Sequence, residues 1–262
     1  MSEQPKPTAA TPGEHPKPSK SKSEKTAIFR LLAALVLPFM YSIARYRIED
    51  GHKLPKEGAF ILSPNHYSEI DPVVVGVFVW RLGRAPRYLA KASLFKVPVL
   101  GWFLRKSGQI PVQRSGAARG SDPLAAARKL ADDGLAVIIY PEGSLTRDPD
   151  LWPMRGKSGA VRMALEAGVP LIPMAHWGTQ AVMPRYGKRI SVFPPKTIRA
   201  KIGDPVDLSA FVGRKIDSAT LNEATALLMR DIAALLAELR GESAPAVLWD
   251  PSQHDQSEIG RF

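Results

Sequence analysis

The residues best suited to chemistry lie together at positions 63–72, in the segment Ser-Pro-Asn-His-Tyr-Ser-Glu-Ile-Asp-Pro. His66 supplies an imidazole, a side chain that can accept and release a proton, and Asp71 follows it five residues later. A carboxylate at this spacing can fold back onto the imidazole, fix its tautomer and stabilise the imidazolium. The pair predicts general-base chemistry on a hydroxyl group, which is worth on the order of 100- to 10,000-fold in rate. Asp71 before Pro72 also fits an N-cap followed by proline at the start of a helix.

Two further segments offer groups that bind anions or orient a hydroxyl. Arg114 ends the segment Gly-Gln-Ile-Pro-Val-Gln-Arg, and a guanidinium at a strand end suits bidentate binding of a phosphate. Glu142 and Gly143 follow an apolar run. The glycine allows close approach of the backbone, and the carboxylate can orient a hydroxyl or an arginine. For each charged residue, an ordinary surface position is the alternative.

The elements that must position these residues alternate along the chain. Short apolar runs predict strands, and amphipathic periods predict helices. The alternation predicts an α/β fold, a mixed central sheet flanked by helices, with functional groups at the carboxyl ends of strands. The expected strands are residues 59–63, 87–91, 109–112, 135–140, 171–175 and 197–202. The expected helices are residues 72–81, 97–105, 122–133, 157–167 and 218–240.

Composition limits the class of protein. The chain has 262 residues and no cysteine, which excludes disulfides, thiolate metal sites and a cysteine nucleophile. Its formal net charge of +11 indicates an acidic partner. Zinc-finger spacings, RNP-like strands and basic helices with heptads are missing, so nucleic acid is not expected. No His-Glu-x-x-His spacing is present either, and no metal site is expected.

The chain divides by composition into four parts. The first is a basic tail, rich in Pro and Lys, with little apolar surface to bury. A membrane-associating helix, one globular domain and a polar C-terminal tail follow it. The expected boundaries are residues 1–25, 26–45, 46–241 and 242–262.

The second part contains an almost wholly apolar run from Ala27 to Ala44, interrupted by Arg30 and Pro38. The run falls just short of the roughly 20 clean apolar residues of a membrane span. We therefore expect an amphipathic or hydrophobic helix in the membrane interface, aided by nearby lysines and arginines. A membrane span and a helix packed on the protein's own core are the alternatives. Residues 94–104, apolar with basic edges, are expected to contact the membrane or to pack in the core.

The order of these blocks resembles the glycerophospholipid acyltransferase family, which includes 1-acylglycerol-3-phosphate acyltransferases. The resemblance covers about residues 45–205 and rests on His-x4-Asp, the strand-end arginine, Pro-Glu-Gly and the proline-bounded apolar run at 168–178. It implies that His66 and Asp71 are the catalytic pair. One departure is that Ser-Leu-Thr separates Gly143 from Arg147, where the family usually has Glu-Gly-Thr-Arg. The substrate-binding residues that the resemblance implies are Asn65, Lys91, Arg114, Glu142, Gly143 and Arg147.

The resemblance implies transfer of an acyl chain from acyl-CoA or acyl carrier protein to the hydroxyl of lysophosphatidic acid, without a bound cofactor. Glycerol 3-phosphate, another lysophospholipid or a glycolipid is an alternative acceptor. The apolar run and the positive charge add an anionic membrane surface as a partner. They indicate a peripheral or monotopic position on the cytoplasmic face of the plasma membrane. A lipid-binding membrane protein without turnover is the alternative from another class.

Overall fold

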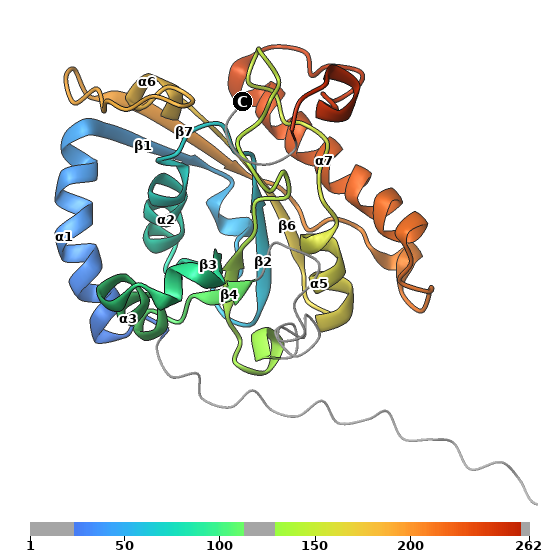
Figure 1. Cartoon of the computed structure of the whole chain (residues 1–262), viewed down its shortest axis with the longest axis horizontal. Helices are drawn as coiled ribbons and strands as arrows, with labels where there is room; N and C mark the ends of the chain where they lie inside the picture. The colour runs from blue at the N-terminus through green and yellow to red at the C-terminus, as the bar shows by residue number, and fades with distance from the viewer. Residues whose placement is uncertain (1–23, 113–128, 258–262) are drawn as a thin grey trace, which may run out of the picture.

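A seven-stranded sheet forms the centre of the computed structural model, which describes residues 24–112 and 129–257 (Figure 1). The strand order is β1-β7-β6-β2-β5-β3-β4. Every neighbouring pair is parallel except β6 with β7, so the sheet is mixed, as predicted. The strands are β1 (Ala44–Glu49), β2 (Phe60–Pro64), β3 (Arg87–Lys91), β4 (Ile110–Val112), β5 (Ala136–Ile138), β6 (Leu171–Trp177) and β7 (Lys196–Ile202).

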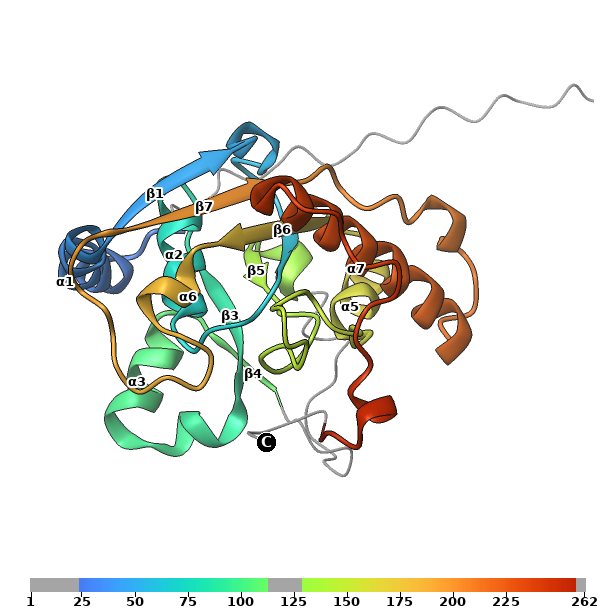
Figure 2. The ribbon, with the colours of Figure 1, turned by 90° about the horizontal axis from the view of Figure 1, so that it is seen from above.

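Helices cover both faces of the sheet (Figure 2). Successive residues of the central strand β2 point to opposite faces. Phe60 and Leu62 pack in a core with α1 and α2, whereas Ile61 packs in a second core with α5 and α7. The helices are α1 (Ala27–Ile43), α2 (Asp71–Arg81), α3 (Pro98–Lys106), α5 (Gly159–Ala167), α6 (Thr179–Val182) and α7 (Ser218–Arg240). Short 3-10 turns are η1 (Gly51–Lys53), η2 (Ala92–Lys96), η3 (Ser209–Phe211) and η4 (Pro251–His254).

Helix α7 has the bounds that its sequence predicted. The side chain of Asp217 accepts a hydrogen bond of 3.0 Å from the backbone N–H of Thr220, which caps the first turn. Gly241 ends the helix in the left-handed region, with φ of 69°. Between these ends, Leu228 and Ile232 are among the residues that bury one face against the sheet.

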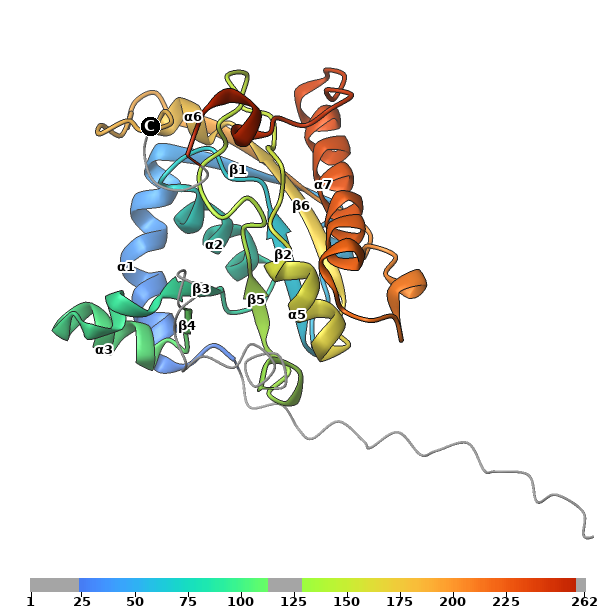
Figure 3. The same ribbon diagram turned by 45° about the vertical axis from the view of Figure 1, so that its right-hand side comes forward.

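Helix α1 ends at Ile43, and Ala44 begins a strand that was not predicted, β1, which pairs with β7. Phe29, Met40 and Ile43 are buried, while other large apolar side chains of α1 are exposed. The helix therefore lies against the rest of the fold along one side (Figure 3) and presents exposed apolar side chains on the other. Within residues 24–112 and 129–257, no helix is long and apolar enough to cross a membrane.

The segment after α7, expected as a polar tail, packs back against the loop that follows Glu142. Met154 and Trp249 form an isolated parallel bridge, and the N–H of Arg155 donates to the carbonyl of Trp249 at 2.8 Å. The Arg155 guanidinium also pairs with Asp250 at 3.0 Å. The predicted helix 122–133 lies largely outside the described residues, although residues 129–132 are helical.

Candidate active site

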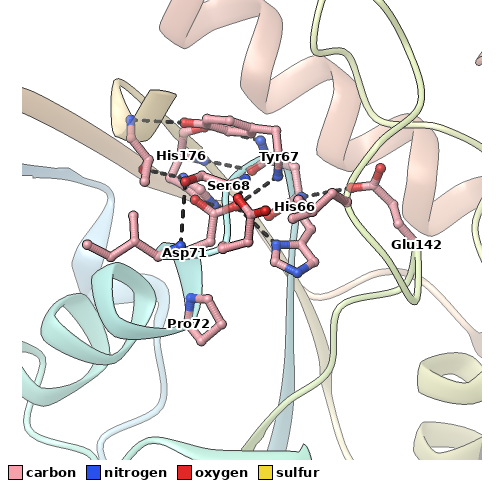
Figure 4. A network of polar contacts seen from close by, with 12 residues as sticks. His66, Tyr67, Ser68, Asp71, Pro72, Glu142 and His176 are labelled. Carbon is pink, nitrogen blue, oxygen red and sulfur yellow. Dashed lines mark hydrogen bonds and ion pairs between the residues drawn. The ribbon is translucent and has the colours of Figure 1, made fainter. Parts of the chain in front are cut away.

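His66 lies in the turn between the end of β2 and the start of α2 (Figure 4). Its Nδ1 atom is 3.0 Å from Oδ2 of Asp71, the first residue of α2. The same oxygen accepts backbone N–H groups from Tyr67 at 2.8 Å and Ser68 at 2.7 Å. The prediction that Asp71 folds back onto His66 is confirmed. The alternative N-cap interpretation is wrong, because Ile70 is the N-cap residue and the carboxylate faces the turn.

The ring nitrogens of His66 have different environments. Because Nδ1 is beside a buried carboxylate, a neutral imidazole keeps its proton on Nδ1 and its lone pair on Nε2. The ring of Tyr140 stacks on the imidazole, with ring centroids 4.1 Å apart, and limits its rotation. The side chain of His66 stays 16% exposed. This geometry suits removal of a proton from a bound hydroxyl by Nε2.

A second histidine, His176 at the carboxyl end of β6, lies behind this pair. Asn65 and His176 are joined by three hydrogen bonds. The His176 N–H donates to Asn65 Oδ1 at 2.9 Å, Asn65 Nδ2 donates to the His176 carbonyl at 3.2 Å, and His176 Nε2 lies 3.0 Å from the Asn65 carbonyl. Asn65 is buried, and these bonds fix the residue before His66 to the next strand. The side chain of Asn65 therefore holds the backbone next to His66 in place.

His176 also approaches the carboxylate. Its Nε2 is 3.9 Å from Oδ1 of Asp71, a buried oxygen that makes no hydrogen bond within the described residues. Burial lowers the pKa of His176, which favours its neutral form. The sequence did not predict a role for His176 in the site. Its place directly after the expected strand 171–175 was a signal that could have found it, because functional groups lie at the carboxyl ends of strands.

Glu142, in the loop after β5, connects this loop to the histidine turn. Its Oε1 accepts the backbone N–H of His66 at 2.8 Å, and its Oε2 accepts the N–H of Met154 at 3.1 Å. The carbonyl of His66 in turn accepts the N–H of Thr146 at 2.7 Å. The side chain is fully buried, so the alternative of a surface salt bridge is wrong. Glu142 therefore joins the histidine turn to the backbone at Met154.

The surroundings of Glu142 have opposite effects on its pKa. Two N–H donors favour the carboxylate, but burial has the larger effect and raises the pKa of Glu142 to about 8. The neutral carboxylic acid is therefore the main form near neutral pH.

The backbone amides of the turn are already engaged. The N–H of His66 donates to Glu142, and those of Tyr67 and Ser68 donate to Asp71. Since these three amides are bonded to carboxyl groups, they are not available to stabilise an oxyanion.

The basic residues predicted to bind phosphate have different positions. Arg147 is buried, and its guanidinium donates to the carbonyl of Ser257 at 3.0 Å and to the hydroxyl of Tyr186. Lys91 ends β3, and Gly143 occupies the left-handed region with φ of 72°, which favours glycine. Arg114 lies outside the described residues.

An apolar groove runs between α1 and α2. Its volume is about 290 Å³, and one end lies at Pro72 and Val73, directly after Asp71. The far end reaches Trp80 and Phe29. The proline-bounded run at 168–178 forms β6, an ordinary core strand buried between β2 and β7, and does not line this groove.

Taken together, the fold and site define an α/β protein with a His-Asp pair at the carboxyl ends of parallel strands and an apolar groove beside it. A family model described as Acyltransferase matches residues 45–177, which is half of the chain. The chain therefore belongs to the Acyltransferase family.

Curated relatives carry the same kind of name. The chain is 30% identical over 165 residues to 1-acyl-sn-glycerol-3-phosphate acyltransferase of Bacillus subtilis, covering 63% of this chain and 75% of that protein. It is 32% identical over 120 residues to 1-acyl-sn-glycerol-3-phosphate acyltransferase BAT2, chloroplastic, of Brassica napus, covering 46% of this chain. That match spans only 33% of the length of the Brassica protein, and a match to an uncharacterized acyltransferase of Schizosaccharomyces pombe spans 49%.

A solved structure has a similar fold. The crystal structure of the 1-acyl-sn-glycerophosphate (LPA) acyltransferase PlsC from Thermotoga maritima superposes with a TM-score of 0.58, covering 82% of this chain and 83% of that one. At 22% sequence identity this similarity shows the shared α/β fold.

Proposed function

We propose that this protein transfers an acyl chain from a thioester to the hydroxyl of 1-acylglycerol-3-phosphate and so makes phosphatidic acid. The observation that carries the proposal is the contact between His66 Nδ1 and the buried Asp71, which leaves Nε2 as the base. The names of the curated relatives support the choice of acceptor.

The reaction proceeds in a ternary complex. His66 Nε2 takes the proton from the acceptor hydroxyl as its oxygen attacks the thioester carbonyl. The tetrahedral intermediate then expels the thiolate, which receives the proton from the imidazolium. Asp71 holds the ring and stabilises its positive charge during both steps. Because the base regains its neutral form, the cycle needs no cofactor.

The apolar groove between α1 and α2 supports a site for an acyl chain, because it opens beside Pro72 and its lining is almost wholly apolar. For the phosphate of the acceptor we propose Arg114 and Lys91, with the backbone at Gly143, because cations bind phosphate strongly. Glu142, Asn65 and Arg147 are positioning residues in this scheme, since each is buried and bonded to protein groups.

Exposed apolar side chains on α1 and α3 support attachment to a membrane. They include Leu35 and Phe39 on α1 and Val99 and Trp102 on α3. Both helices are close to basic residues, which favours an anionic surface. We propose a peripheral or monotopic position on the cytoplasmic face of the plasma membrane, where acyl-CoA and acyl carrier protein are available.

The test is acyl transfer by the purified protein in detergent. Labelled palmitoyl-CoA and palmitoyl-acyl carrier protein are each offered with lysophosphatidic acid, glycerol 3-phosphate or lysophosphatidylcholine. The expected product is labelled phosphatidic acid, and His66→Ala should reduce its formation about 100- to 10,000-fold. His52→Ala, which replaces an exposed histidine in η1, is the control and should keep wild-type turnover.

Transfer to a different acceptor would reject lysophosphatidic acid as the substrate while keeping the chemistry. Lipid binding without transfer to any acceptor, equal in wild type and His66→Ala, would instead indicate the lipid-binding alternative.

A further inference from the structure

The loop between α6 and β7 exposes apolar side chains that the membrane predictions did not include. We call residues 187–194 the apolar loop. Phe193 is 82% exposed, Val192 is 52% exposed and Ile190 is also exposed. The backbone N–H of Ser191 donates to the carbonyl of Val182 at 2.7 Å, so the loop folds back on α6. A tip with three large apolar side chains is costly in water and indicates a site of interaction.

The residues that lead into this loop contact the turns of the candidate active site. The hydroxyl of Ser68 donates to the carbonyl of Met183 at 2.7 Å, and the N–H of Tyr186 donates to Glu69 at 3.1 Å. The guanidinium of Arg185 donates to the carbonyl of Thr146 at 2.8 Å. The segment therefore joins the rim of the site to the apolar tip.

The apolar loop lies on the same side of the molecule as α1 and α3, as Figures 1 and 2 both show. These three segments are far apart in the sequence, yet each has large exposed apolar side chains. The loop also carries two exposed cations, Lys188 and Arg189, directly beside Ile190. Apolar anchors flanked by cations match the chemistry of an anionic bilayer, with a hydrocarbon interior below a layer of negative headgroups.

We propose that the apolar loop inserts into an anionic bilayer as a contact separate from α1 and α3. Ile190, Val192 and Phe193 enter the acyl region, and Lys188 and Arg189 lie among the headgroups. Through Met183, Arg185 and Tyr186 the inserted loop holds the rim of the site at the membrane surface. The proposal rests on the proposed function in one respect, because it gives a bilayer-resident acceptor a short path to His66.

The absence of cysteine from the chain allows a direct test on the full-length protein. Phe193→Cys receives an environment-sensitive fluorophore, and Val247→Cys, at a position also 82% exposed, receives the same label as a matched control. Each labelled protein is mixed with vesicles of phosphatidylcholine containing phosphatidylglycerol. The emission at position 193 should shift to the blue, and the emission at position 247 should not.

Three outcomes would overturn the proposal. The label at position 193 could remain in water while the protein sediments with the vesicles, or both labels could shift equally. A blue shift at position 193 without vesicles, increasing with protein concentration, would assign the loop to contact with a second copy.

The role of the cations has its own test. Lys188→Gln should weaken partition onto phosphatidylglycerol vesicles roughly fivefold, with no effect on neutral phosphatidylcholine vesicles. Lys215→Gln, an exposed lysine before α7, is the matched control and should have little effect. Equal effects of the two substitutions would reject a local electrostatic contact.

Activity assays separate this proposal from the proposed function. Phe193→Ser should keep the wild-type rate of transfer to acceptors dispersed in detergent. Its rate of transfer to acceptors embedded in vesicles should fall several-fold. A shifted label in a protein without transfer activity would reject only the proposed function. Normal transfer from vesicles with a label that stays in water would reject only the insertion of the loop.

Discussion

His66 and Asp71 depend on each other because one carboxylate oxygen accepts three hydrogen bonds. Oδ2 of Asp71 orients the imidazole and also fixes the N–H groups of Tyr67 and Ser68. The side chain is fully buried behind the imidazole. Asp71 therefore acts on the reaction through the histidine.

Asp71→Asn keeps the size of the side chain but removes its charge. We expect kcat to fall on the order of 100- to 10,000-fold, because the imidazolium loses its counter-charge, while KM for the acceptor changes little. Steady-state kinetics measure both constants, and circular dichroism reports whether the variant is folded. Glu69→Gln makes the same chemical change at an exposed position in this turn and should keep kcat. A folded Asp71→Asn variant with normal kcat would contradict the assignment.

Glu142 should make stability depend on pH. Burial raises its pKa in the folded state to about 8, whereas the unfolded carboxyl titrates near its ordinary value of 4.5. The folded state therefore holds the proton more tightly. The stability that protonation of Glu142 adds to the fold is fully present below about pH 4.5 and is lost as the pH rises through about 8. The free energy of unfolding, measured with urea, should be lower at pH 9 than at pH 6 by on the order of a few kcal/mol.

Glu142→Gln tests whether Glu142 causes this pH dependence of stability, because an amide does not titrate. The variant starts from lower stability, since the amide N–H₂ faces a backbone donor that the carboxyl oxygen accepted. Its free energy of unfolding should change less between pH 6 and pH 9 than that of the wild type. An equal change in both proteins would place the titrating group elsewhere.

At the level of elements, the sequence predicted those whose signals are local. Helix α7 has its capping residue, its period and its final glycine within one segment, and its predicted bounds hold. Strand β1 was not predicted, because the arginines on either side of Tyr46 directly follow the apolar run of α1 and fit the basic edge of a membrane helix. The contact between His66 and Asp71 was predictable because both belong to one turn.

The rest of the site depends on contacts between distant segments. Glu142 becomes a positioning residue because the loop after it returns to bring Met154 onto its second oxygen. His176 reaches Asn65 because β6 pairs with β2. Arg147 is covered by Tyr186 and by the segment that ends at Ser257. No spacing within a single segment encodes these three positions.

The groove between α1 and α2 gives an element-level prediction. Ala33 lines this groove, whereas its neighbour Ala34 is exposed and does not line it. Ala33→Phe should fill the groove and reduce kcat/KM for palmitoyl donors about tenfold relative to octanoyl donors, because a long chain loses more apolar contact. Ala34→Phe adds the same side chain outside the groove and should keep the wild-type preference. Equal preferences in both variants would place the acyl chain elsewhere.

At the scale of the whole molecule, one carboxylate fixes the start of α1 to other parts of the chain. Glu24, just before α1, pairs with the guanidinium groups of Arg84 and Arg87. Arg84 is buried and also donates to the carbonyls of Pro55, Gly58 and Gly134, at 2.8 to 2.9 Å. The start of α1 is thereby fixed to turns from three other parts of the chain. The opposite end of α1 is fixed by its direct continuation into β1.

Glu24→Gln should therefore destabilise the whole fold. It leaves the buried Arg84 without its counter-charge, although three carbonyls remain bonded to it, and we expect a loss of about 2–4 kcal/mol in the free energy of unfolding. Urea unfolding measures the loss, and hydrogen exchange should show faster opening of α1 than of α7. Glu57→Gln, at an exposed position, should stay within about 0.5 kcal/mol of the wild type. Because the pair is buried, the difference between the two variants should persist at 0.5 M salt. If both variants unfold like the wild type, the apolar contacts of α1 with α2 and the sheet hold the helix in place. The groove beside α1 then does not depend on the ion pairs of Glu24.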